Sequence, residues 1–263
     1  MMITVLIGIL YLFRFIFGAC IFSFLTVVIF RLPKGEELVY GRSHCPGCGR
    51  VLGAGELIPC ISYLVQGGKC LGCGMKISGQ YFLVECLGGL AFITCSACFG
   101  SGESGFLSLR GWVAFSYMAI LTVVAFIDWN TKIIYDRFHI FIALLGIAAI
   151  WLFPEHTVGE RLIGAVIVAV PMLILALLID GAFGGGDIKL MAVSGWLLGW
   201  RAMIPAIFIG IITGGIYCLW MLARGKMTRK TRFAFGPFLA IGLAVSYIYG
   251  EQILTWYLSV WQI

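Results

Sequence analysis

Charged residues are scarce in this sequence. They make up 11% of its 263 residues, whereas a typical soluble domain has about 25%. Hydrophobic residues make up 61%, and the mean hydropathy is +1.04. Internal repeats and low-complexity segments are also missing. This composition excludes a soluble globular protein, and the length of the apolar runs predicts an all-α polytopic membrane protein.

Acidic residues are the scarcest charged group, with 12 Asp and Glu against 18 Lys and Arg, which gives a net charge of +6. The basic residues lie in short loops between apolar runs. This is the arrangement that the positive-inside rule describes for cytoplasmic loops. The excess positive charge therefore does not indicate a nucleic-acid partner, and the partner predicted from composition is the lipid bilayer.

A cleavable secretory signal is not apparent either. The first apolar run, residues 3–32, has Arg14 as the one charged residue in its interior. Arg31 lies at its end, and Lys34 follows it. A signal peptide would have a shorter apolar region and a small-residue cleavage site. We therefore expect residues 1–32 to form the first membrane helix, held by cytoplasmic charges at its end.

Further apolar stretches follow the first. They lie at residues 81–99, 111–127, 138–152, 162–179, 188–200, 203–222 and 235–249. Most approach the roughly 20 residues that a helix needs to cross a bilayer, but 188–200 is shorter. If that stretch did not cross, the basic loop 224–232 would face outside, against the positive-inside rule. We therefore expect about eight transmembrane helices, with both termini outside.

The only sizeable polar segment is residues 33–80, directly after the first predicted helix. On this topology it is cytoplasmic, as are the loops at 128–137 and 180–187. The loops at 101–110 and 154–161 are weakly charged or acidic, and we expect them outside.

Four of the ten cysteines form two Cys-x-x-Cys pairs in the polar segment, Cys45 with Cys48 and Cys70 with Cys73. This spacing is close to that of zinc ribbons, in which four thiolates bind one zinc ion. Glycines inside the pairs would allow the tight turns that direct both sulfur atoms to one ion. A cytoplasmic loop is reducing, which disfavours disulfides. We expect a structural zinc site, because four thiolates leave no position for water; unrelated free cysteines are the alternative.

Two aspartates lie at the predicted cytoplasmic ends of apolar runs. Asp187 follows three glycines and is expected to open a helix, where its side chain can accept hydrogen bonds from free backbone N–H groups, whereas Asp128 ends an apolar run. Ionisable groups at a membrane boundary are costly and are therefore candidates for function. Two close carboxylates cannot both ionise, so one can act as general base on water while the other polarises a peptide carbonyl. The alternative for Asp187 is an acidic helix cap in a glycine loop. The alternative for Asp128 is an ordinary residue at a helix end.

Several motifs occur in an order that resembles one enzyme family. They are residues 23–33, the two cysteine pairs, 57–64, 67–70, 77–81 with Glu85, 127–128, 184–190 and 235–240. Together they are similar to those of the type IV prepilin peptidases, which are bifunctional leader peptidases and N-methyltransferases of pilus and type II secretion systems. The resemblance covers nearly the whole chain.

The resemblance implies an eight-helix aspartic protease of the GxGD type in the bacterial inner membrane. Its two catalytic aspartates, at the cytoplasmic face, correspond to Asp128 and Asp187. Its active-site loop corresponds to Gly184, Gly186 and Lys189.

The resemblance also implies a substrate and two cofactors. The substrate is a type IV prepilin or pseudopilin with a short basic leader ending in glycine, and the new N-terminal residue is methylated from S-adenosylmethionine. S-adenosylmethionine is thus one cofactor, and structural zinc is the other. Gly68 and Lys69 match the family's methyltransferase-associated dipeptide. The acids expected to contact the substrate are Glu56, Glu85, Asp136 and Asp180. A buried ion pair is the alternative role of Glu85.

Three regions follow from these expectations. Residues 1–32 form the first membrane helix, and residues 33–80 form a cytoplasmic region that binds zinc through four cysteines and is associated with methyl transfer. Residues 81–263 form the transmembrane peptidase core. No glycine-rich fingerprint of a soluble S-adenosylmethionine domain is present.

Three other interpretations are open. One is a transporter with carboxylates at broken helix ends near the bilayer middle, but these aspartates lie at helix ends on one side, which favours proteolysis. Another is a membrane scaffold with a zinc knuckle, which would leave the aspartates and the glycine loop unexplained. The third is a peptidase that lacks methyl transfer, against which the four cysteines weigh.

Overall fold

The structure, a computed structural model, describes residues 2–38, 40–101, 106–179, 181–226 and 233–260. Within these residues the chain is mostly α-helical and folds as two compact units, residues 1–115 and 116–263. The predicted helical character is therefore confirmed. Asp180 and most of the basic loop predicted at 224–232 lie outside the described residues.

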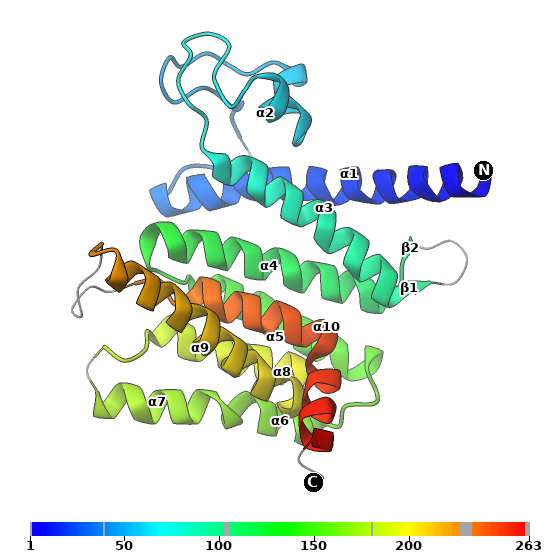
Figure 1. The fold of residues 1–263 in the computed structure, drawn as a ribbon, viewed down its shortest axis with the longest axis vertical. Coiled ribbons are helices and arrows are strands. Elements are labelled where there is room, and N and C mark those ends of the chain that lie inside the picture. Colours follow the sequence, from blue (N-terminus) through cyan, green and yellow to red (C-terminus); the bar gives the residue numbers. More distant parts are fainter. Residues whose placement is uncertain (1, 39, 102–105, 180, 227–232, 261–263) are drawn as a thin grey trace. The chain divides into compact units, whose positions relative to one another are not determined.

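Figure 1 labels the α-helices and β-strands. With the two 3-10 helices η1 and η2, the order of elements is α1 (Met2–Arg31), η1 (Leu32–Lys34), η2 (Ala54–Leu57), α2 (Ile61–Val65), α3 (Gly79–Phe99), β1 (Gly100–Ser101), β2 (Phe106–Leu107), α4 (Leu109–Thr131), α5 (Asp136–Leu152), α6 (Val158–Ile167), α7 (Ala169–Leu178), α8 (Gly185–Leu198), α9 (Trp200–Ala223) and α10 (Gly236–Val260). The strands β1 and β2 form a short antiparallel pair. The last helix continues past residue 249, where the predicted apolar stretch ends.

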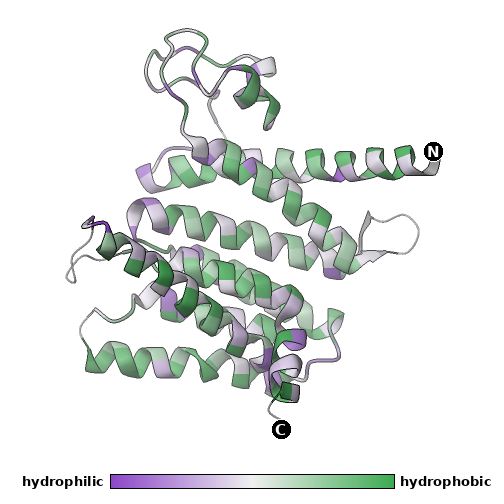
Figure 2. Ribbon diagram, viewed as in Figure 1, coloured by the Kyte–Doolittle hydropathy of each residue, from purple (hydrophilic) through white to green (hydrophobic). Residues whose placement is uncertain are grey.

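Among the residues that the structure describes, six helical segments are long and apolar enough to cross a membrane: Thr4–Lys34, Gly79–Phe99, Leu109–Thr131, Val158–Leu178, Trp200–Ala223 and Gly236–Val260. Figure 2 shows apolar residues along these helices and hydrophilic residues mainly near helix ends and in the polar segment. The predicted stretches 138–152 and 188–200 are also helical, as α5 and α8, but they contain only 17 and 14 residues. The helices thus fit a membrane protein with several spans, while the number eight stays a prediction.

The stretch predicted as one helix at 162–179 consists of two helices, α6 and α7, which are separated at Val168. Pro171 has no N–H to donate to the carbonyl of Ile167, and its ring crowds that carbonyl, which interrupts the helix at this point. The loop predicted at 154–161 is also shorter than expected. Because α6 begins at Val158, the last four residues of that predicted loop are helical.

In the first unit α1 packs against α3. The two helices cross closely because each carries a glycine at the crossing: a Cβ on Gly88 would overlap the side chain of Phe22 and lie 2.6 Å from the carbonyl oxygen of Gly18. Phe22 and Phe92 are fully buried in this unit. The polar segment between the two helices contains only the short elements η1, η2 and α2.

In the second unit α5 and α6 pack on α8, and α9 packs on α10. The backbones of α6 and α8 touch, since a Cβ on either Gly164 or Gly195 would overlap the carbonyl oxygen of the other glycine. A Cβ on Gly146 of α5 would likewise overlap the ring of Trp196 of α8. Such close contacts fix the positions of α5, α6 and α8 along one another.

A buried arginine joins the C-terminal ends of α5 and α8. The side chain of Arg161, on α6, is fully buried. Its Nη1 donates to the carbonyl of Leu197 at 2.8 Å, and its Nη2 donates to the carbonyls of Ala149 at 2.9 Å and Phe153 at 3.2 Å. The guanidinium thus lies at the negative ends of two helix dipoles. Because α5 and α8 pack together and both end at this side chain, their N-terminal ends also lie together.

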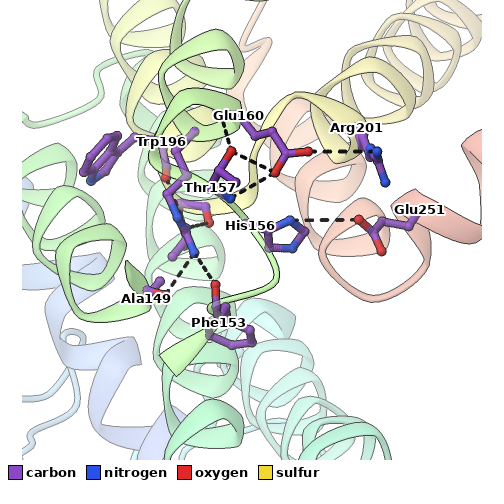
Figure 3. Close-up of polar contacts among 10 residues, drawn as sticks. Ala149, Phe153, His156, Thr157, Glu160, Trp196, Arg201 and Glu251 are labelled. Atoms are coloured by element: carbon purple, nitrogen blue, oxygen red, sulfur yellow. Dashed lines mark hydrogen bonds and ion pairs between the residues drawn. The ribbon is translucent and has the colours of Figure 1, made fainter. Parts of the chain in front are cut away.

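Further polar contacts lie around the start of α6, as Figure 3 shows. Thr157 caps α6 by accepting a hydrogen bond from the N–H of Glu160 at 3.2 Å. Glu160 also pairs with Arg201 of α9 at 3.9 Å, and His156 pairs with Glu251 of α10 at 4.0 Å. These contacts link the start of α6 to α9 and α10.

Candidate active site and metal centre

Asp128 lies near the end of α4 and is almost completely buried, with 5% of its surface exposed. Its Oδ2 accepts a hydrogen bond from the backbone N–H of Gly236, at the start of α10, at 2.9 Å. A Cβ on residue 236 would lie 2.7 Å from that oxygen, so only glycine allows α10 to approach so closely. The unpaired N–H groups at a helix start favour a carboxylate there.

Asp187 is also buried, with 8% exposed. The prediction that Asp187 lies at the start of a helix and accepts from a free backbone N–H is confirmed, because α8 begins at Gly185 with Gly184 as its N-cap residue. Gly184 has no side chain to bond the helix start, and Asp187, in the first turn, reaches back instead. Its Oδ2 accepts a hydrogen bond from the N–H of Gly184 at 3.2 Å. Its Oδ1 has no hydrogen-bond partner among the described residues.

The two aspartates lie in one region of the second unit. The negative charge of Asp128 acts on Asp187, so the carboxyl groups are within electrostatic range of each other. The glycine loop and the start of α10 are also neighbours, since the ring centroids of Phe183 and Phe235 are 5.7 Å apart. Each phenylalanine precedes the glycine that binds one of the aspartates. Two buried carboxyl groups in one region, one with an unpartnered oxygen, can bind and activate a water molecule.

A second polar cluster joins the starts of α5 and α8. Lys189 Nζ lies 2.8 Å from Asp136 Oδ1 and forms an ion pair with it. His139 is buried, and its Nδ1 lies 3.3 Å from the same oxygen. His139 was not among the predicted site residues, although its place three residues after Asp136 on a helix puts both on one face. A Cβ on Gly186 would lie 2.9 Å from the Cβ of Ile134, so this glycine lets the loop lie against the segment before α5.

Glu85 has two partners inside the first unit. It is buried, its Oε1 accepts a hydrogen bond from Ser23 Oγ at 2.7 Å, and its Oε2 accepts one from the N–H of Cys60 at 2.7 Å. The partners are a hydroxyl and an amide, and in the described part of the chain no cation pairs with Glu85. Glu85 therefore does not form the buried ion pair that was its alternative role.

Glu56 is occupied as well. It forms an ion pair with Arg50, and its Oε2 accepts a hydrogen bond from the N–H of Gly53 at 2.9 Å. The Gly53 N–H and the Arg50 guanidinium lower the pKa of Glu56. Its carboxylate thus connects the first cysteine knuckle to η2.

The four cysteines of the two pairs form one cluster. Their Sγ atoms all lie within 4.8 Å of one another, and Cys45 Sγ is 3.7 Å from Cys73 Sγ. The backbone N–H groups of Cys73 and Gly72 lower the pKa of Cys70 to about 6, which favours the thiolate form that binds zinc. Four sulfur ligands at this separation fit a tetrahedral zinc ion.

The two knuckles share one backbone geometry. In each, the glycine after the second cysteine, Gly49 or Gly74, has a φ of 71° or 72°, and its N–H donates to the carbonyl of the first cysteine at 2.8 or 2.9 Å. Glycine adopts this φ without strain. The glycines inside the pairs, Gly47 and Gly72, have no positive φ, so the left-handed position of each knuckle lies at the glycine after it.

The dipeptide Gly68-Lys69 leads the chain from α2 into the second knuckle. Gly68 has a φ of 67°, and its N–H donates to the carbonyl of Tyr63 at 2.9 Å. A Cβ on Gly68 would lie 2.9 Å from the hydroxyl oxygen of Tyr63. Lys69 is exposed and forms a backbone bridge with Lys76.

The sequence matches two family models. One, described as the bacterial peptidase A24 N-terminal domain, matches residues 16–99, and the other, described as the type IV leader peptidase family, matches residues 115–219. The first match lies within the first unit, which contains the cysteine cluster. The second match contains both Asp128 and Asp187.

Curated relatives match over most of the chain. Proteins named prepilin leader peptidase/N-methyltransferase from Bacillus subtilis (strain 168), Dichelobacter nodosus and Aeromonas salmonicida (strain A449) are 32%, 33% and 29% identical to it. These alignments cover 94%, 90% and 93% of this chain and 97%, 91% and 92% of the relatives. No solved structure matches. The two family matches, together with these nearly full-length alignments, show that the chain belongs to the type IV leader peptidase family, whose bacterial members include the prepilin leader peptidase/N-methyltransferases.

Proposed function

We propose that this chain is an integral-membrane aspartic endopeptidase that removes the basic leader of type IV prepilins or pseudopilins after a glycine and N-methylates the new N-terminal residue. Membership of the leader peptidase family supports this reaction class. The observation that carries the catalytic assignment is the buried pair Asp128 and Asp187, in which Oδ1 of Asp187 has no partner among the described residues.

Asp128 and Asp187 act as a dyad in this proposal. Like charges in close approach cannot both ionise, so one carboxyl group holds a proton. The ionised carboxylate takes a proton from the attacking water, and the protonated group donates to the oxygen of the scissile peptide. The backbone N–H groups of Gly236 and Gly184 hold one oxygen of each aspartate and so orient both carboxyl groups before the substrate binds.

The ion pair between Lys189 and Asp136 holds the active-site loop by joining the starts of α8 and α5. The Asp136 side chain is still 68% exposed, so its charge is open to a cation of the substrate's basic leader. Glu56 and Asp180 are further candidates for this attraction. Glu85 is also a candidate polar contact of the substrate, although both of its oxygens already accept hydrogen bonds.

We assign eight membrane spans to the chain, with α5 and α8 as short crossings beside the six longer segments. A short α8 would hold Asp187 near the cytoplasmic surface of the bilayer or thin the bilayer locally. The active site then faces the cytoplasm from the bacterial inner membrane. On this topology residues 1–32 are the first span, residues 33–80 the zinc and methyltransferase-associated region, and residues 81–263 the peptidase core.

The methyl-transfer half of the proposal takes its support from the names of the relatives. S-adenosylmethionine, when bound, supplies the methyl group that the new N-terminal amine receives. Gly68 and Lys69 are the residues of the family's methyltransferase-associated dipeptide. Within the family the alternative is a peptidase without methyl transfer, and the intact cysteine cluster weighs against it.

We expect one structural zinc ion, held by Cys45, Cys48, Cys70 and Cys73. Replacing Cys70 by serine removes a thiolate ligand, so the zinc content should fall from stoichiometric to about a tenth or less. Metal analysis of the purified protein measures this. The matched control is Cys98→Ser, which changes an exposed cysteine outside the cluster. Equal zinc contents in the two variants would contradict the site.

The proposed function is tested with the purified full-length protein in detergent. It is incubated with S-adenosylmethionine and a prepilin whose basic leader ends in glycine, and the products are analysed by mass spectrometry. We expect the leader to be lost after the glycine and one methyl group to be gained at the new N-terminus. A cut but unmethylated product would favour the peptidase-only alternative, and an uncut prepilin would return the transporter and scaffold interpretations.

A further inference from the structure

The first unit contains an open cavity of about 410 Å³ that the aspartate site does not use. It lies in the polar segment that follows α1. Its walls include Arg31, Glu36, Glu37, Tyr40, Arg42 and Val51. This volume is in the range of sites for small organic molecules.

Hydrogen bonds to the backbone hold the cavity in shape. Arg31, at the end of α1, donates to the carbonyls of Glu37 at 3.2 Å and Arg42 at 3.5 Å. The His44 ring contacts the carbonyl of Arg42 at 3.3 Å, and His44 forms an antiparallel bridge with Val51 of the first cysteine knuckle. The knuckle therefore provides one wall of the cavity, and folding of the zinc site would determine the shape of that wall.

The side chains around the cavity carry charges of both signs. The Arg42 guanidinium and the Glu37 carboxylate form no ion pair or hydrogen bond with any residue that the structure describes. Glu36 only approaches Lys34, at 4.0 Å. The ring of Tyr40 is 78% exposed at the cavity and is therefore accessible to a ligand there. The cavity thus offers an anion site, a cation site and an aromatic surface.

The geometry points to this cavity as the binding site of S-adenosylmethionine, a zwitterion with an aromatic base and a positively charged sulfur. This inference rests on the proposed methyltransferase activity. The Arg42 guanidinium is suited to the carboxylate of the methionine part, since planar guanidinium groups bind carboxylates in a bidentate manner. Glu36 and Glu37 are suited to its two positive charges. The Tyr40 ring can stack on the adenine or face the sulfonium.

The test is direct binding to the purified full-length protein in detergent, with radiolabelled S-adenosylmethionine in equilibrium dialysis and unlabelled S-adenosylhomocysteine by calorimetry. The variants are Arg42→Gln, Glu37→Gln and Tyr40→Ala. The matched control is Lys76→Gln, which removes an exposed positive charge from the same polar segment outside the cavity. Zinc content and thermal unfolding midpoint show whether each variant is folded.

We expect Arg42→Gln and Tyr40→Ala to weaken binding of both ligands at least tenfold, with the control within twofold of the wild type. Glu37→Gln should weaken binding of S-adenosylmethionine more than that of S-adenosylhomocysteine, because only the former has a charged sulfur. Folded cavity variants that bind both ligands like the wild type would overturn the assignment. A loss of binding in Lys76→Gln as large as that in Arg42→Gln would overturn it too, because a general loss of positive charge would then explain both.

The outcome for the cavity is separable from that for the methyltransferase. If the wild type methylates a cut prepilin and the folded cavity variants bind the donor normally, the cavity is wrong and the proposed function stands. If the wild type binds neither ligand and transfers no methyl group, both are wrong.

Discussion

Replacing Asp128 or Asp187 by asparagine is expected to slow prepilin cleavage about a thousandfold or more while the protein stays folded. Asparagine has nearly the shape of aspartate, and its side-chain oxygen can still accept a hydrogen bond from the N–H of Gly236 or Gly184. It cannot take a proton from water, so the chemistry is lost while the packing is kept. Mass spectrometry of the cleaved prepilin measures the rate.

The double variant gives a sharper result. Because the two carboxyl groups act as a unit, removing both should cost no more than removing the more important one. The matched control is Glu251→Gln, the same change of acid to amide at an exposed position of α10, where the side chain only approaches His156 at 4.0 Å. We expect the control to cleave at the wild-type rate. A folded Asp128→Asn variant that cleaves as fast as the control would rule out the dyad.

Replacing Arg161 by leucine is expected to lower the thermal unfolding midpoint by about 10 °C. The substitution removes the donors to the carbonyls at the ends of α5 and α8, and each hydrogen bond from a charged group contributes about 1.5 to 3 kcal/mol. A loss of roughly 3 kcal/mol corresponds to a shift of this size in a chain of this length. Arg161→Lys should lie between leucine and the wild type, because a single ammonium cannot span both helix ends as the planar guanidinium does.

Arg201→Leu is the matched control for that experiment. Arg201 lies near the start of α9 and also contacts α6, through an ion pair with Glu160 at 3.9 Å. Its side chain, however, is 55% exposed. Exposed pairs contribute about 0 to 1 kcal/mol, so its midpoint should change by less than about 4 °C. If Arg161→Leu and Arg201→Leu unfolded at the same temperature as the wild type in one detergent, the buried arginine would not join the helix ends.

The parts of this protein that depend on local sequence could be predicted. Apolar length predicts the membrane helices, since a bilayer sets a minimum number of residues for a crossing. The spacing of Cys45, Cys48, Cys70 and Cys73 predicts one sulfur cluster, because two residues between cysteines bring each pair of sulfur atoms together. Asp128 and Asp187 are visible as candidates because acids are rare in this chain and these two lie at the ends of apolar runs.

The partners of these groups could not be predicted in the same way. Arg161 follows a loop-like sequence and was expected outside the helices, yet it is fully buried on α6. His139 lies within an apolar run, and only its contact with Asp136 marks it as part of the site. The break at Val168 has a local signal in Pro171, but the length of the apolar run predicts a single helix.

By itself, then, the sequence determined the membrane character, the cysteine cluster and the two candidate aspartates, because each depends on composition or on spacing within a few residues. Only the tertiary structure decided that Gly236 binds Asp128, that Lys189 pairs with Asp136, and that one arginine joins α5 to α8. The physical reason is that a buried polar group must find its partner among whichever backbones pack beside it. That packing is set by contacts between residues far apart in the chain, such as Gly164 with Gly195, where the absence of a Cβ lets two helices touch.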